Sequence, residues 1–476
     1  MSGPTLELAM IVRNGESCLA RCLNSSLPAV SGILVGDTGS TDASRDIAQG
    51  MGARVLEIPW ENDFAKARNA VLQECRADWV LWLDADEMLD PAGAAWIPAL
   101  LEQNQKAKVP VDAWEVWRWN YVRTLNSRSG ELVAEPNPVR LEESRPYPAY
   151  TRHLNTLLFR RLPGLYFENC VHETVSGRVR ALGLHAAEAP FVIHHFGAVE
   201  DSEQVGKDKR ELYYQLGRQK VLDNPEDDWA HYELGLSELE HHHDAAAALT
   251  CFERALALNP AREGAWIYAG ICLTRLGRLR EALDCLRHAE QMDVYSGLLQ
   301  AALGDVFFQA GDARQAVRCY RLAAECAAAS PLLQCKLGAC EVCLGEFAAG
   351  LERIEAGVAR EPEAGELYEI WAAAAFQAGD TVTAANVAAQ RLSLGKPPAS
   401  SFIVAATIEA HQGHWDKALV LLRDGQQRYP ADPMLEREAQ AVQQRISVGE
   451  SAAAISNQTA EPACLAEIPT VAESQP

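Results

Sequence analysis

The chain of 476 residues is long enough for two or three domains of the usual size, and it carries a formal net charge of −22. This acidic balance argues against a nucleic-acid partner, whose phosphates demand a basic surface, and against an anionic membrane surface. The amino terminus lacks a signal peptide's basic and apolar regions, and no apolar run approaches the roughly 20 residues of a membrane span, so we expect a cytoplasmic protein without a span.

The first informative element is a short apolar run, residues 33–35, that leads into an acidic turn at residues 36–42. Gly39 allows the backbone to turn sharply, and the polar residues after it are good helix N-caps. The pattern therefore predicts a strand, a tight turn and the start of a helix. Asp37 is left to point into the crevice at the end of the strand, where a carboxylate suits the N–H and hydroxyl donors of a nucleoside.

The next element is a D-x-D motif, Asp84 and Asp86, that follows the very apolar residues 79–83. Such a run predicts a strand buried on both faces of a central parallel sheet, and ligands of these sheets bind beyond the carboxyl ends of the strands. Side chains two residues apart on an extended strand point the same way. Mg²⁺ and Mn²⁺ take few protein carboxylates together with phosphate oxygens, so we expect a metal-bound diphosphate here. By itself a D-x-D is a weak signal, because most Asp-rich turns are solvated loops.

Four motifs in the expected order over residues 6 to 90 resemble family 2 glycosyltransferases. The motifs are MIVRN at 10–14, DTGSTD at 37–42, DFAKARN at 63–69 and WLDADE at 82–87. The chain is most similar to the subfamily with tetratricopeptide repeats, in the group containing the peptide S-glycosyltransferases of glycosylated bacteriocins. The resemblance implies an α/β GT-A (Rossmann-like) domain at residues 1–200, a nucleotide-diphosphate sugar donor, UDP in particular, and a divalent Mn or Mg cofactor.

The resemblance also implies roles for single residues of the donor site. Asp37 would hold the nucleoside, Asp84 the ribose or the metal, and Asp86 the metal. Arg68 and Asn69, in the third motif, could reach phosphate or ribose, although Arg68 could equally pair with a surface carboxylate.

Residues 110 to 200 should complete this domain. The segment 112–122, rich in Trp and Tyr, predicts a strand whose aromatic rings either stack against a sugar or only pack a core. Residues 124–152, with four prolines, predict a long acceptor-side loop. The apolar runs 157–161 and 165–167 predict two further strands.

The dipeptide His172-Glu173 follows those runs, as a similar His-Glu does in the related enzymes, so the resemblance implies a catalytic-region role for both residues. An inverting transfer needs a base for the acceptor's proton, and Glu173 is the candidate. The alternative is a structural His-Glu pair buried beside the site. His195, in the predicted strand 191–197, matches the family's His-x-Gly and would be a third metal ligand or a diphosphate contact, or else a structural histidine.

Several departures from the family pattern bear on the acceptor side. Gly15 stands where the family often has Glu, and residues 168–170 replace the usual glycine-containing approach to His-Glu. The chain has neither the Gln-x-x-Arg-Trp motif nor the membrane span of processive polysaccharide synthases, so we expect transfer of a single sugar.

The carboxy-terminal half contains an internal repeat. Glycines recur every 34 residues, the tetratricopeptide period, at positions 277, 311, 345, 379 and 413. We expect a linker helix at 201–227, about six repeats at 228–431 and a disordered tail at 443–476. An all-α tetratricopeptide solenoid of this kind has a concave surface suited to a protein, peptide or glycan acceptor, or to another partner.

Two side-chain groups within the repeats could be mistaken for metal sites. Cys340 and Cys343 form one C-x-x-C without a second pair, so we expect no zinc site, and the scattered cysteines suit reduced, buried thiols. The run His241–His243 fits a solvated inter-helix turn better than a metal site.

Two rival functions remain. The chain could be a non-catalytic tetratricopeptide scaffold with a relic sugar-nucleotide domain, although the intact acidic motifs argue against decay. A nucleotidyltransferase on a similar fold would need a glycine- and Arg-rich amino-terminal loop, which the sequence lacks.

Overall fold

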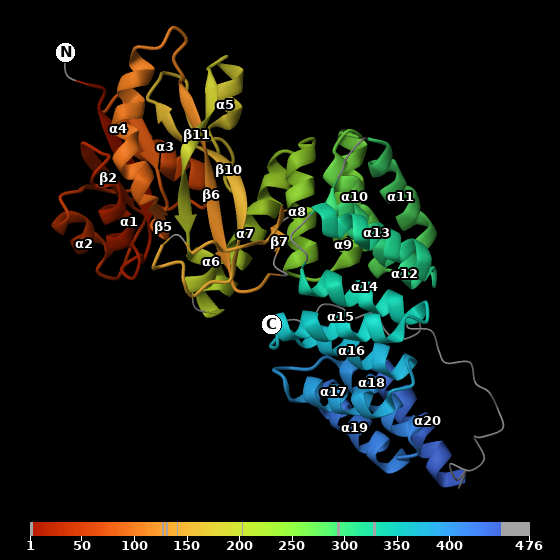
Figure 1. The fold of residues 1–476 in the computed structure, drawn as a ribbon. Helices are drawn as coiled ribbons and strands as arrows, with labels where there is room; N and C mark the ends of the chain where they lie inside the picture. Colours follow the sequence, from red (N-terminus) through yellow and green to blue (C-terminus); the bar gives the residue numbers. More distant parts are fainter. Residues whose placement is uncertain are drawn as a thin grey trace. The chain divides into compact units, whose positions relative to one another are not determined.

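The computed structural model describes residues 3–448, except for residues 126–127, 130–131, 140, 202, 293–295 and 327–329. It divides into two compact units, Met1–His242 and His243–Pro476 (Figure 1). The first unit contains the sheet, and the second is helical throughout its described part. The predicted combination of an α/β domain and an all-α solenoid is confirmed.

The amino-terminal unit is built on one mixed sheet, which has nine strands within the described residues. Eight of them lie in the order β3-β2-β1-β4-β10-β6-β11-β5, and β9 pairs with β10. The bounds are β1 (Leu6–Val12), β2 (Gly32–Asp37), β3 (Arg54–Glu57), β4 (Trp79–Trp82), β5 (Glu87–Leu89), β6 (Ala113–Val122), β9 (Glu135–Pro136), β10 (Ala149–Arg160) and β11 (Ala186–His195). Strands β1 to β4 are parallel, whereas β10 runs antiparallel to both β4 and β6.

Helices α3 and α4 of this unit begin at aspartate caps. The carboxylate of Asp63 accepts a hydrogen bond from Lys66 N at 2.8 Å, and that of Asp90 accepts one from Ala92 N at 3.0 Å. The bounds are α1 (Leu19–Ser26), α2 (Ser44–Gly50), α3 (Phe64–Glu74), α4 (Pro91–Gln105), α5 (Ser176–Ala181), α6 (Gly197–Glu200), α7 (Glu203–Asp223) and α8 (Asp228–Glu240). Helix α7 lies within the predicted linker helix, residues 201–227.

Strand β4 carries the core of the sheet on both faces. Leu81 packs into one apolar cluster with Leu8 of β1, while Val80 and Trp82 pack into the cluster on the other face. All four side chains are fully buried. The strand buried on both sides that the sequence predicts before the D-x-D is therefore confirmed.

Two expectations for the second half of the domain need correction. Residues 165–167 are not a strand, because the amide of Asn69, and not a neighbouring strand, bonds the backbone of Phe167. The predicted loop 124–152 already contains paired structure: β9 pairs with the start of β10, and β7 (Arg128–Ser129) pairs with β8 (Leu132–Val133). Parts of this segment lie outside the described residues.

The carboxy-terminal unit consists of antiparallel helix pairs that follow the 34-residue period. Its helices are α9 (Ala245–Leu258), α10 (Glu263–Arg275), α11 (Leu279–Gln291), α12 (Gly297–Gln309), α13 (Ala313–Cys326), α14 (Pro331–Cys343), α15 (Phe347–Arg360), α16 (Gly365–Gln377), α17 (Thr381–Ser393), α18 (Ala399–His411), α19 (Trp415–Arg428) and α20 (Pro433–Val448). The turn glycines named above have φ between 73° and 86°, a region that favours glycine. Of the predicted tail, residues 443–448 belong to α20, and the rest lies outside the described residues.

Small residues allow the helices of a pair to approach closely. A Cβ on Gly304 would lie 2.5 Å from the ring of Tyr320, and a Cβ on Gly338 would lie 2.6 Å from the carbonyl oxygen of Gly350. Among the described residues, no helix combines the length and apolar content that crossing a bilayer requires.

A buried ion pair joins two helices of the repeats. Glu369 on α16 and Arg391 on α17 are each 4% exposed, and Arg391 Nε lies 2.8 Å from Glu369 Oε1. Ser401 on α18 donates to the same carboxylate. Because α16, α17 and α18 meet at the buried Glu369 carboxylate, the packing of these three helices requires a cation beside it.

Replacing Arg391 by Met would leave the Glu369 carboxylate buried without its cation. We expect Arg391→Met to lower the free energy of unfolding by about 3–5 kcal/mol, the usual cost of an uncompensated buried charge. The double variant Glu369→Leu/Arg391→Met removes the charge as well and should regain most of the loss. Urea denaturation followed by circular dichroism measures both, and a single variant as stable as the parent would contradict the role of the pair.

Candidate active site

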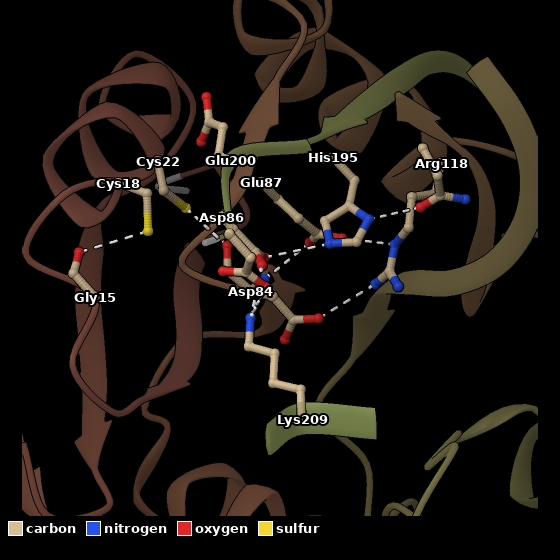
Figure 2. A network of polar contacts seen from close by, with 12 residues as sticks. Gly15, Cys18, Cys22, Asp84, Asp86, Glu87, Arg118, His195, Glu200 and Lys209 are labelled. Atoms are coloured by element: carbon tan, nitrogen blue, oxygen red, sulfur yellow. Dashed lines mark hydrogen bonds and ion pairs between the residues drawn. The ribbon is translucent and has the colours of Figure 1, made fainter. Parts of the chain in front are cut away.

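The D-x-D lies in a turn and not in an extended strand. Strand β4 ends at Trp82, and Glu87 N donates to Asp84 O at 3.0 Å, which closes the turn before β5. The expectation that Asp84 and Asp86 point the same way is therefore wrong. Figure 2 shows the two carboxylates in different contacts, Asp84 toward Arg118 and Asp86 toward His195 and Lys209.

Asp84 is held by two arginines from different elements. Arg68 Nη2 of α3 lies 3.0 Å from Asp84 Oδ1, and Arg118 Nη2 of β6 lies 3.6 Å from Asp84 Oδ2. Its backbone N–H donates to Glu87 Oε2 at 2.8 Å. Asp84 is thus fixed by cations of the protein itself.

Asp86 lies on the other side of the turn, against the end of β11. Its Oδ1 lies 3.4 Å from His195 Nε2, and its Oδ2 lies 3.8 Å from Lys209 Nζ. Burial alone would raise the pKa of Asp86, but the charge and hydrogen bond of His195 and the charge of Lys209 hold it well below its usual range. Phe196 N also donates to Asp86 O at 3.1 Å, so the backbone of the turn is joined to β11.

A hydrogen-bond partner on the neighbouring strand sets the orientation of the His195 ring. Its Nδ1 lies 2.7 Å from Asn120 Oδ1, a partner on the neighbouring strand β6. This contact turns Nε2 toward Asp86, an arrangement typical of metal-binding histidines. Burial opposes charging of His195, yet the carboxylate of Asp86 raises its pKa above the ordinary value.

Glu87 forms the floor of the site. Its side chain is completely buried, and its Oε1 lies 2.6 Å from Arg118 Nε. Burial raises the pKa of Glu87 to about 7, with Asp84 adding to the rise and Arg118 opposing it. Arg118 therefore serves two neighbouring carboxylates from one position on β6.

Glu173 is brought to the same site by Arg68, whose Nη2 forms an ion pair with Glu173 Oε1 as well as with Asp84. The side chain of Glu173 is 10% exposed. Backbone hydrogen bonds between Glu168 and Thr174 close the loop that carries it. His172 has a left-handed backbone (φ 53°) and an exposed side chain.

Asn69 does not reach toward the D-x-D. Its amide accepts a hydrogen bond from Phe167 N at 2.7 Å and donates one to Phe167 O at 2.9 Å. This residue positions the segment that precedes Glu173. A direct donor contact for Asn69 therefore finds no support in this geometry.

Asp37 ends β2 and is covered by its own turn. Ser40 N donates to Asp37 Oδ1 at 3.0 Å, and Arg45 Nε lies 2.5 Å from Asp37 Oδ2. Burial would raise the pKa of Asp37, but the hydrogen bonds from Ser40 and Arg45 lower it. The carboxylate stands at the carboxyl edge of the sheet, where Arg45 is its present partner.

Sequence reasoning missed Arg118, Lys209 and His153. Arg118 lies between aromatic residues in the predicted strand 112–122, and Lys209 lies in the predicted linker helix 201–227. His153 faces Arg118 across the β6–β10 ladder, and burial together with the charges of Arg118 and His195 lowers its pKa. Arg118 is the one basic residue in the sequence of the predicted strand 112–122, a signal that could have pointed to it.

Metal binding can be tested against the residues present. Within the described part of the chain, no group of three or more His, Cys, Asp or Glu side chains is arranged to hold a metal ion. Asp86 and His195 do lie together, whereas Asp84 faces arginines. A Cβ on Gly197 would lie 2.3 Å from Asp86 Oδ2 and 2.9 Å from His195 Nε2, so glycine keeps this pair accessible. One carboxylate and one imidazole fit a Mg²⁺ or Mn²⁺ ion whose other ligands are phosphate oxygens and water.

Comparison with known proteins identifies a family for part of the amino-terminal unit. Residues 8–161 match the family model described as glycosyl transferase family 2. The amino-terminal unit carries a family 2 glycosyltransferase domain. The family match ends before Glu173 and His195, so the roles of these residues rest on the geometry given above.

Relatives cover both halves of the chain. A TPR repeat-containing protein of Synechococcus elongatus is 30% identical over 48% of this chain and 51% of its own length. The glycosyltransferase SunS of Bacillus subtilis is 32% identical over 18% of this chain and 21% of its own length. The chain thus spans about half or less of these relatives. A solved tetratricopeptide repeat protein from Parabacteroides merdae covers 50% of this chain and 94% of its own, with 14% identity and a TM-score of 0.43.

Asn69→Ala would leave the backbone N–H and C=O of the buried Phe167 without their partners. We expect this variant to lower the free energy of unfolding by about 1–3 kcal/mol, the cost of buried polar groups that lose their hydrogen bonds. Gln73→Ala, at an exposed position of the same helix, is the control and should change it by less than about 0.5 kcal/mol. Equal effects in urea denaturation would show that the amide does not anchor this segment.

Proposed function

We propose that the protein is a metal-dependent, inverting glycosyltransferase that moves a single sugar from a UDP-sugar to a protein, peptide or glycan acceptor. The observation that carries the proposal is the pairing of Asp86 with His195 beside the Arg68–Asp84–Arg118 cluster. This arrangement puts an accessible carboxylate and imidazole next to fixed positive charge at the carboxyl edge of the sheet. The family 2 match over residues 8–161 supports the same reaction class.

On the donor side, Asp86 and His195 would hold a Mn²⁺ or Mg²⁺ ion, which supplies charge stabilisation for the departing diphosphate when it is bound. Arg68 and Arg118 keep Asp84 in place, and this carboxylate, which is 29% exposed, is assigned to the ribose or the metal. Asp37, at the end of β2, is assigned to the nucleoside, with Arg45 releasing the carboxylate when the base binds.

On the acceptor side, Glu173 takes the proton of the attacking acceptor group as the bond to the anomeric carbon forms and the bond to the diphosphate breaks. Its ion pair with Arg68 holds the carboxylate at the edge of the site. His172, exposed on the same loop, is assigned to the acceptor entrance. The tetratricopeptide repeats are assigned to binding part of the acceptor, since such surfaces suit extended chains.

Asp86→Ala removes the carboxylate that would hold the metal. We expect donor hydrolysis and sugar transfer to fall to background. His195 carries no negative charge, and the Asp84 carboxylate faces Arg68 and Arg118, so neither residue can replace Asp86. The measurement is UDP release from UDP-sugars in MnCl₂. Asp46→Ala, an exposed acidic position on α2, is the matched control and should leave the rate unchanged. Undiminished turnover in Asp86→Ala would overturn the metal assignment.

Glu173→Gln keeps the shape of the side chain but removes its ability to accept a proton. We expect the transfer rate to fall by about 10²- to 10⁴-fold, the usual contribution of a general base. Calorimetric titration should show UDP affinity within about threefold of the parent, since a base acts on the acceptor only. A matching fall in UDP affinity would instead indicate a structural His-Glu pair.

A further inference from the structure

Helix α7 presents a stripe of side chains to the site. Lys209, Tyr213 and Leu216 are spaced by four and three residues, so they share one face of the helix. Lys209 Nζ lies 3.8 Å from Asp86 Oδ2 (Figure 2), and the carbonyl oxygen of Leu216 accepts a contact from Cys170 Sγ at 3.9 Å. The helix that follows the last strand therefore runs along the candidate site from Asp86 to the Glu173 loop.

Aromatic contacts hold this face in register. The ring of Tyr213 meets Phe64 edge-on at 5.6 Å between centroids and His172 at 6.2 Å. Phe64 in turn donates its backbone N–H to Cys170 O at 2.9 Å. Because Tyr213 lies one turn after Lys209, these contacts fix the height of the Lys209 backbone beside the D-x-D.

The ammonium of Lys209 has two carboxylate partners and remains accessible. It lies 2.7 Å from Asp201 Oδ2, at the end of α6, and its side chain is 46% exposed. Its contact is with Oδ2 of Asp86, whereas Oδ1 of the same carboxylate faces His195 Nε2. A lysine is a compact charge on a flexible stem with four carbons, so it can move by several ångströms while α7 stays in place.

We propose that Lys209 is an exchangeable cation of the donor site: it neutralises Asp86 in the free protein and moves onto the donor's diphosphate when metal and nucleotide bind. This proposal deepens the proposed function and rests on it. The exchange keeps the charge around Asp86 balanced in both states. In the bound state the ammonium contacts oxygens of the leaving diphosphate, whose negative charge grows as the sugar departs.

The competing explanation is that Lys209 only ties α7 to α6 through Asp201. The two explanations predict opposite effects on the affinity for free metal. If Lys209 is only structural, its removal weakens the binding of metal and nucleotide alike. If it is an exchangeable cation, its removal strengthens the binding of free metal, because the ammonium competes for Asp86, and weakens the binding of the diphosphate. Asp201→Asn breaks the same tie but leaves the ammonium in place.

The test is calorimetric titration of the full chain with UDP and UMP in MnCl₂, together with titration of Mn²⁺ alone followed by electron paramagnetic resonance. For Lys209→Gln we expect UDP affinity to fall by about 10- to 100-fold, as for the loss of a charge-assisted contact, and UMP affinity to change much less. Mn²⁺ alone should bind about 30-fold tighter, the effect on a divalent ion of removing one unit charge about 4 Å away. Lys209→Arg should retain most of the UDP affinity.

Two variants serve as controls. Lys207→Gln, an exposed position on the same helix, should leave all three affinities unchanged. Asp201→Asn should bind UDP as tightly as the parent or tighter. The inference is overturned if Lys209→Gln leaves UDP affinity unchanged, or if Asp201→Asn weakens it equally. If the parent binds no UDP at all, the proposed UDP-dependent function fails, and the inference fails with it.

Discussion

The site depends on balancing negative charge that the sheet brings together. Asp84, Asp86 and Glu87 follow one another within four residues at the end of β4, and Glu173 joins them from a distant loop. Carboxylates this close repel one another and lose hydration when buried, so each needs a cation or a hydrogen-bond donor. Arg68 on α3 and Arg118 on β6 supply the cations.

Arg68 shows how much one residue can connect. Its guanidinium bridges Asp84 and Glu173, and it lies over the rings of Trp82 and Phe167 at 5.1 and 5.3 Å from their centroids. A planar cation can pair along its edge and stack through its face at once, which an ammonium cannot do. Asp84 and Glu173 are thus coupled through a single buried group.

The site also divides into a fixed part and an adjustable part. Arg68 and Arg118 are 9% and 19% exposed and take part in several contacts, so they hold one geometry. Lys209 comes from α7, outside the sheet, and its side chain is 46% exposed, so it can respond to a ligand. Fixed charge sets where a diphosphate would lie, and the adjustable lysine then completes its surroundings.

The local sequence pattern predicted those parts of the fold that depend on the burial of neighbouring residues or on the repeat period. The apolar run before Asp84 became β4, and the 34-residue glycine period became the turns of the solenoid, because both patterns are set by neighbours in sequence. The predicted direction of the two D-x-D carboxylates was wrong, because a hydrogen bond from Glu87 N to Asp84 O turns the chain there. Arg118 and Lys209 were missed because nothing in their local sequence records which distant carboxylate they meet.

The pairing of β5 with β11 has a consequence for how the protein is made. Strand β5 has no other neighbour in the sheet order, and its ladder joins Glu87 to His195, more than a hundred residues later. At a synthesis rate of about 5–20 residues per second, the ribosome needs on the order of 5–20 s to supply that partner. Until then the acidic turn has no partner strand, so the nascent domain completes the candidate site only when its last strand emerges.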